Sequence, residues 1–221
     1  MNKRNKAFLI TGVLALLIGL RLVLTDIALK ELNKFLGSFS ESYVAHVDNL
    51  GLSFLRGAYR FEGASATLRS AKEPFLRVEY IDVSLAWRDL FKGMLRTDIM
   101  IHGLRAQVSD NTAKALTTAK GTKKDAEELG QTLFPLQISR VDIQNSALSI
   151  HDMEKLPEDL AIRLTQIEGR LSNATPSEGN TVSLAKLKAV LQDKASVYAV
   201  GEVDSRRHPV EWHLAVESRE L

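Results

Sequence analysis

A ten-residue pattern occurs three times in this 221-residue chain and limits what the chain can fold into. The pattern reads apolar, any, Gly or Asn, two of any kind, Ala or Leu, any, aliphatic, any, Ser or Asp. The copies are Phe61–Ser70, Ile101–Asp110 and Ile143–Asp152. Gly and Asn tolerate a positive φ best, so the third position of each copy predicts a bend or bulge between two strand segments; these positions are Gly63, Gly103 and Asn145.

After each bend, apolar residues return at a spacing of two, which is the period of a strand with one buried face. These pairs are Ala66 and Leu68, Ala106 and Val108, and Leu148 and Ile150. The third positions lie 40 and 42 residues apart. A repeat of this length favours stacked supersecondary units over one closed globule. The alternative is a chance match among the strands of an ordinary β meander.

The bulk composition excludes several classes of protein. The net charge is +2 and the basic residues are scattered, so there is no footprint for nucleic acid. The chain has no cysteine, which excludes thiolate metal sites, disulfides and thiol catalysis.

The N-terminus predicts a single-pass membrane anchor. Residues 1–6 form a basic tail, and residues 7–24 are apolar except for Arg21 near one end. As a helix this segment spans about 27 Å, close to the roughly 30 Å hydrocarbon core. The basic tail places the N-terminus in the cytoplasm. A cleaved signal peptide is the alternative, but no small-x-small cleavage site follows Leu20.

Residues 25–37 predict an amphipathic helix that rests on the sheet or on the bilayer surface. Its predicted apolar face consists of Ile27, Ala28, Leu32, Phe35 and Leu36, opposite a polar face of Asp26, Lys30, Asn33 and Lys34. The helix could plug the membrane end of a groove, or it could be a stalk that packs on the first strands.

Residues 38–221 predict a β domain. The clearest strand is Phe75–Trp87, whose alternation changes parity and predicts a bulge or sharp twist near Tyr80–Ile81. Residues 111–131 are rich in charge and predict an exposed, mobile loop with at most one weak helical turn. Three closing runs with short polar turns indicate a β meander, namely Val182–Leu191, Ser196–Val203 and Val210–Val216. A sheet edge left open by this meander could pair with an envelope protein or with a second copy.

No constellation of catalytic residues is apparent. The five histidines show no i, i+4 pair of the kind that a zinc protease carries on a helix, and there is no phosphate-binding Gly-rich loop or Gly-x-Ser-x-Gly elbow. We therefore expect no metal, no cofactor and no enzymatic activity. A sheet with aliphatic faces must still cover them, by folding on itself, by a helix or by lipid chains.

Several short motifs resemble the AsmA-like family, in particular the branch that carries the DUF748 domain. They follow the basic anchor and are Leu55–Gly57, Phe61–Gly63, Pro74–Leu76 with Val78, Ile81–Leu85, Leu90–Gly93, Ile99–Gly103, and Phe134–Ile150 with Asn145. The resemblance implies a protein of the Gram-negative inner membrane with a periplasmic β groove and a role in outer-membrane biogenesis. Larger members are associated with phospholipid transport between the membranes. About ten strands span only about 50 Å, which is short for a complete bridge.

The sequence thus predicts an open, twisted, antiparallel sheet built from repeats, whose apolar face binds phospholipid. The predicted lining residues are Phe61, Ala66, Leu68, Val83, Leu85, Ile101, Ala106, Val108, Leu148 and Ile150. The alternative is a structural or assembly factor of the envelope with a filled core and no lipid. The two hypotheses differ in whether these positions form an open stripe or pack against a helix.

Overall fold

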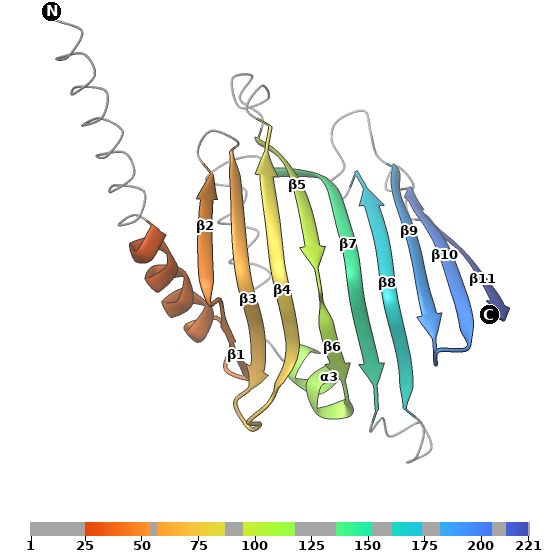
Figure 1. The fold of residues 1–221 in the computed structure, drawn as a ribbon, viewed down its shortest axis with the longest axis horizontal. Coiled ribbons are helices and arrows are strands. Elements are labelled where there is room, and N and C mark those ends of the chain that lie inside the picture. Colours follow the sequence, from red (N-terminus) through yellow and green to blue (C-terminus); the bar gives the residue numbers. More distant parts are fainter. Residues whose placement is uncertain are drawn as a thin grey trace, which may run out of the picture.

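The protein is built around one large sheet (Figure 1). The computed structural model describes residues 25–53, 57–86, 95–117, 136–151, 161–173, 182–204 and 211–220. Eleven strands in these ranges form a mixed sheet. They are β1 Tyr43–His46, β2 Asn49–Ser53, β3 Ala58–Leu68, β4 Pro74–Leu85, β5 Leu95–His102, β6 Arg105–Val108, β7 Leu136–Ile150, β8 Ile162–Ser172, β9 Val182–Leu191, β10 Ala195–Asp204 and β11 Glu211–Glu220.

The strand order is β1-β3-β4-β5-β7-β8-β9-β10-β11, with β2 also on β3 and with β6 between β4 and β7. The predicted antiparallel sheet is wrong at one place, because β5 and β6 pair with β7 in parallel. A parallel neighbour needs a long crossover connection, and the chain between β6 and β7 supplies it. The mainly β fold and the open sheet agree with the prediction for the described strands.

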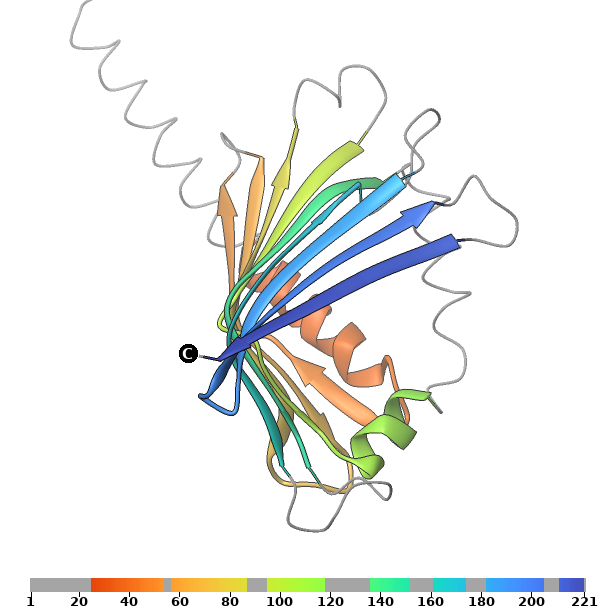
Figure 2. The same ribbon diagram turned by 90° about the vertical axis from the view of Figure 1, so that its right-hand side faces the viewer.

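A helix over residues 25–38 packs on the first strands. It lies on the same side of the sheet as the short helix α3 (Asp110–Thr117), inside the bend that Figure 2 shows in the long strands. The predicted apolar face of this helix is wrong in part. Ile27 and Phe35 are more than half exposed, whereas Leu29, Leu32, Asn33 and Leu36 are part-buried.

Asn33 explains this rotation of the helix. Its side-chain amide donates a hydrogen bond to the carbonyl of Val47 and its side-chain oxygen accepts one from the N–H of Val47, both at 2.8 Å. A two-way amide contact of this kind holds the helix against the link between β1 and β2. The amphipathic period alone, which places Asn33 on the polar face, does not reveal it.

The predicted loop over 111–131 begins with more than the single helical turn expected, because α3 covers the eight residues Asp110–Thr117. Ser109 and Thr112 cap its first turn reciprocally: the N–H of Ser109 donates to Oγ1 of Thr112 at 2.7 Å, and the N–H of Thr112 donates to Oγ of Ser109 at 3.4 Å. Residues 118–135 lie outside the described ranges.

The predicted tail and anchor over residues 1–24 also lie outside the described ranges. Among the helices of the described residues, none has the length and apolar character needed to cross a membrane.

Candidate functional site

A crease runs across the sheet at the three positions that the repeated pattern marks. Gly63, Gly103 and Asn145 have φ values of 63°, 67° and 47°. Register places Gly63 and Gly103 on either side of Glu79, and places Asn145 beside Gly103. The line continues into β8 at Gln166, where φ is 49° and the pairing with β9 shifts. The crease therefore joins five neighbouring strands, from β3 to β8, at one level of the sheet.

The strands change face at this crease. Glu79 and Tyr80 are consecutive in β4, yet both contact His102: Oε2 of Glu79 lies 3.1 Å from Nδ1, and the Tyr80 ring stacks at 4.7 Å. Consecutive side chains of a regular strand point to opposite faces, so β4 turns over here. Val78 and Ile81 consequently share a face. The predicted change in alternation is present next to Tyr80–Ile81. The pairing of β4 with β3 keeps one register from Tyr80 to Leu76, so β4 has no extra residue relative to β3 and this is not a β-bulge.

The apolar side chains form unbroken rows that cross the strands. Direct pairing defines one row next to the crease: Leu50, Phe61, Ile81, Ile101, Ile143, Gly169, Leu187, Ala199 and Val216. A parallel row one step further away contains Leu52, Tyr59, Val83, Ile99, Val141, Leu171, Ala185, Gly201 and Leu214.

A third row lies beyond the crease, on the same face because of the change at Glu79–Tyr80. Its members are Ala45, Ala66, Leu76, Ala106, Leu148, Leu164, Leu191 and Ala195. These three rows, which we call the apolar gutter, run along the inside of the bend. Their members come from β1 to β11, and the first row consists of apolar residues from β2 to β11.

Burial along the gutter falls from one end to the other. In the first row, Leu50 is 6% exposed, Leu187 is 37% exposed and Val216 is 62% exposed. Val47, Leu52 and Val78 are buried at the end where the helix of residues 25–38 packs. The first row is therefore covered at β2 and exposed at β9 and β11, although Tyr59 of the second row is 38% exposed and Ala189 of β9 is fully buried.

The structure brings the ten predicted lining residues onto this one face. Phe61 and Ile101 belong to the first row, Val83 to the second, and Ala66, Ala106 and Leu148 to the third. Val108 pairs with Ile150 beyond the third row, and Leu85 pairs with Thr97 beyond the second. Ala66 and Leu68 are buried, so as lining of an open groove these two predictions are wrong. They sit in the filled end, next to β1.

The open end of the gutter was missed by reasoning from the sequence. Leu187, Leu214 and Val216 are among its most exposed members. They belong to the closing meander and not to a copy of the repeat, although the alternation in β9 and β11 carries the same signal. Ile81 and Ile143 were also missed: Ile81 lies between the predicted Phe61 and Ile101 in the first row, and Ile143 follows Ile101.

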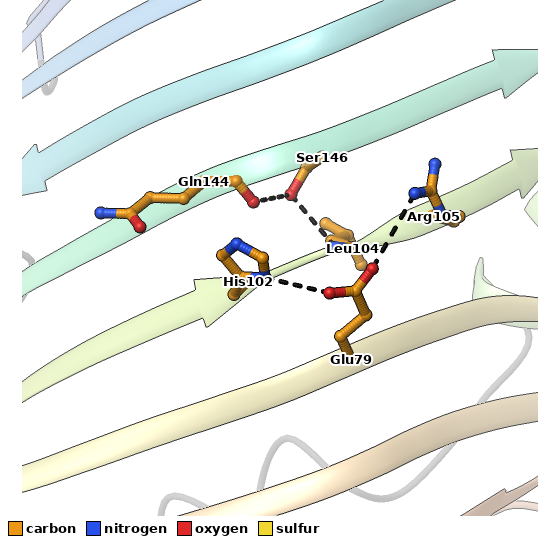
Figure 3. Close-up of polar contacts among 6 residues, drawn as sticks. All are labelled: Glu79, His102, Leu104, Arg105, Gln144 and Ser146. Carbon is orange, nitrogen blue, oxygen red and sulfur yellow. Dashed lines mark hydrogen bonds and ion pairs between the residues drawn. The ribbon is translucent and has the colours of Figure 1, made fainter.

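A polar network holds the crease between β4 and β7 (Figure 3). Oγ of Ser146, which is 2% exposed, accepts a hydrogen bond from the N–H of Leu104 at 3.1 Å and donates to the carbonyl of Gln144 at 2.9 Å. Glu79 contacts His102 and, at 3.9 Å, Arg105. The Ser146 hydroxyl thus provides a hydrogen-bond acceptor for the backbone N–H of Leu104, between the end of β5 and the start of β6.

The opposite face of the sheet is charged. Asp142 accepts a hydrogen bond from Nε of Arg170 at 2.6 Å, and its other carboxylate oxygen lies 3.2 Å from Nε of Arg140. Arg60 donates to both carboxylate oxygens of Asp82, at 2.7 Å each. The hydrogen bond to Asp142 raises the pKa of Arg170 above its ordinary value, so this guanidinium stays charged. A hollow of about 820 Å³ over β7 to β10 is lined by charged and amide residues of β7 to β9, and its lining also includes Tyr198, Val200 and the gutter members Ile143, Leu187 and Ala199.

The described residues hold no group of three or more His, Asp or Glu side chains placed to bind a metal ion. In a comparison with known proteins, no family model and no curated protein matches this chain. The function is therefore inferred from the gutter and from the motifs of the chain.

Proposed function

We propose that this chain is a single-pass inner-membrane protein of the AsmA-like type, of the branch with the DUF748 domain, that binds phospholipid in the periplasm and serves outer-membrane biogenesis. The observation that carries the proposal is the apolar gutter, whose first and second rows reach β11 without a charged residue and end there in the exposed Val216 and Leu214. The role is binding or transfer, and not catalysis.

The dimensions of the gutter suit acyl chains. A row through nine strands is about 40 Å long at about 4.8 Å per strand. One leaflet of a bilayer contributes about 15 Å of hydrocarbon, so an acyl chain lying along the gutter fits within its length. Each CH₂ group that leaves water gains about 0.8 kcal/mol. The favourable term is not directional, so the gutter would accept chains of different length.

The structural alternative has support at one end of the molecule. Leu50, Ala66, Leu68 and Val78 are already covered and need no lipid. An assembly factor with a filled core would have this covering along the whole sheet. The exposure of Leu187 and Val216 favours lipid binding over that alternative.

A pair of substitutions on opposite faces tests the lipid proposal. Leu187→Asp places a charge in the gutter, whereas Val200→Asp places one on the other face at a similar starting exposure, 37% against 45%. The full chain and both variants are extracted in mild detergent and analysed by native mass spectrometry and lipid extraction. We expect phospholipid with the unmodified chain and with Val200→Asp, and at least a tenfold loss with Leu187→Asp.

A folded, lipid-free protein would contradict the proposal and favour the structural alternative. Equal lipid retention by the two variants would also contradict it, because bound lipid would then lie outside the gutter.

A further inference from the structure

The hollow over β7 to β10 has a floor of polar side chains. They recur at every second residue of their strands, which puts them on the face opposite the gutter, and gutter members such as Leu187 alternate with them. Direct pairing across the strands joins Arg170 to Lys186, and Glu168 to Lys188. The members on β7, β8 and β9 are Asp142 and Gln144, Glu168 and Arg170, and Lys186 and Lys188, respectively.

Three cationic side chains occupy adjacent positions on this floor. Arg170 is the cross-strand partner of Lys186, and Lys188 follows Lys186 on the same face, about 7 Å along β9. Both lysines are exposed, and neither forms an ion pair with another described residue. Like charges at this separation repel each other, so an anion that bridges the two ammonium groups is favoured.

The buried carboxylate beside these cations is already occupied. Asp142 accepts a hydrogen bond from Arg170 and lies 3.2 Å from Arg140, and its side chain is only 10% exposed. Its negative charge is therefore balanced by the two guanidinium groups. The positive charge of Lys186 and Lys188 is left for a ligand.

The rest of the lining suits hydroxyl groups. The side-chain amides of Gln144, Asn145 and Gln166 are exposed and supply both donors and acceptors. Glu168 adds a carboxylate acceptor, and Tyr198, which is 39% exposed, offers a ring against which a sugar can pack. The volume of about 820 Å³ lies in the range of small-molecule sites, about 300–1,000 Å³.

We propose that this hollow binds a phosphate monoester of a sugar or polyol. The phosphate lies between Lys186 and Lys188, and the hydroxyl groups bind the amides and Glu168. A monoester carries about two negative charges, which match the two ammonium groups, whereas the phosphodiester of a phospholipid headgroup carries a single one. The site lies on the face opposite the gutter and does not depend on lipid binding there.

Titration calorimetry of the full chain tests this site, with glucose phosphate (the monoester at the primary hydroxyl) as the probe. A polyoxyethylene detergent is used, because it contains neither sugar nor phosphate. We expect glucose phosphate to bind, and glucose and inorganic phosphate to bind at least about tenfold more weakly, since each lacks part of the ligand. Glycerophosphoglycerol, a soluble phosphodiester that represents a phospholipid headgroup, is also expected to bind at least about tenfold more weakly.

Single substitutions locate the site. Lys186→Gln and Lys188→Gln each remove one charge and are expected to weaken the binding of glucose phosphate about tenfold. The control Lys194→Gln makes the same change in the turn between β9 and β10, outside the lining, and is expected to leave the affinity unchanged. Far-UV circular dichroism checks that the three variants fold alike.

Chemical labelling gives a readout that needs no substitution. Acetylation of the full chain by an N-hydroxysuccinimide ester, followed by peptide mass spectrometry, compares the reactivity of each lysine with and without glucose phosphate. At about ten times the dissociation constant, the ligand is expected to slow acetylation of Lys186 and Lys188 about tenfold. The reactivity of Lys194 is expected to stay the same.

A chain that shows neither binding nor protection would overturn the inference, and so would an equal loss of affinity in Lys194→Gln. Inorganic phosphate or the phosphodiester bound as tightly as glucose phosphate would overturn the choice of a sugar phosphate monoester. Calorimetry and labelling measure the polar hollow, whereas phospholipid retention measures the gutter, so the two proposals fail separately.

Discussion

Gly103 shows how much of the crease depends on single residues. A Cβ at this position would lie 2.8 Å from Cβ of Glu79, and φ is +67°. A Cβ at Gly63 would likewise be too close to a carboxylate side chain, because it would lie 2.9 Å from Cβ of Asp48. Glycine at these positions therefore allows a carboxylate side chain to lie over the backbone. The positive φ was predictable from residue type, whereas the carboxylate that covers each glycine was not, because it comes from a neighbouring segment: Glu79 of β4 over Gly103, and Asp48 of the link between β1 and β2 over Gly63.

Gly103→Ala is expected to lower the free energy of unfolding by about 1–3 kcal/mol, because Ala resists the positive φ and its Cβ displaces Glu79. Urea denaturation of the full chain in detergent measures this. The matched control is Gly201→Ala, where the nearest side-chain atom lies 3.6 Å from the new Cβ and φ is not positive. An equal loss in both variants would contradict the account of the crease.

At the scale of elements, the helix of residues 25–38 is positioned by one amide. Its period predicted a helix over nearly the right range, but placed Asn33 on the wrong face. Amphipathic periodicity considers only where apolar side chains recur. It does not identify a polar side chain, such as that of Asn33, which faces the sheet because it binds backbone groups there. The strands were predicted more closely, as in β9, which has the predicted bounds Val182–Leu191. Strand alternation is a local property, so the sequence carries it directly.

Asn33→Leu is expected to destabilise the protein by about 1–3 kcal/mol, since the N–H and the carbonyl of Val47 lose their partners. Lys34→Leu is the control, because Lys34 is exposed on the same helix and the substitution changes helix propensity in a similar way. Thermal unfolding followed by circular dichroism compares the two. A Tm loss for Lys34→Leu as large as that for Asn33→Leu would argue against the amide contact.

At the scale of the whole molecule, the repeat copies become neighbours in register. The second and third copies pair in parallel at an offset of 42 residues, Ile101 with Ile143 and Ala106 with Leu148. This offset is the spacing of the copies in the chain. The first copy lies across β4 from the second, so that Phe61, Ile81 and Ile101 follow one another. The repeat predicted stacked units, but the parallel pairing depends on a crossover whose path no local pattern encodes.

Burial differs between strands, which predicts uneven stability. β3 and β10 are both flanked by strands, but β3 contains the buried Ala66 and Leu68, whereas Tyr198 and Val200, on the face of β10 opposite the gutter, are 39% and 45% exposed. Amides of β3 are therefore expected to exchange hydrogen at least tenfold more slowly than those of β10. Hydrogen exchange with mass spectrometry on the full chain measures this. Equal rates in the two strands would contradict the burial gradient.

The crease also has a mechanical consequence. A single layer of strands has little to resist bowing along its long direction, from β1 to β11. A crease along the sheet raises its bending stiffness, because some strand segments then lie above the mean plane of the sheet and others below it. The line through Gly63, Gly103 and Asn145 is such a fold. The described strands form one layer, which this fold stiffens without a second sheet, and the inner side stays open where neither helix covers it.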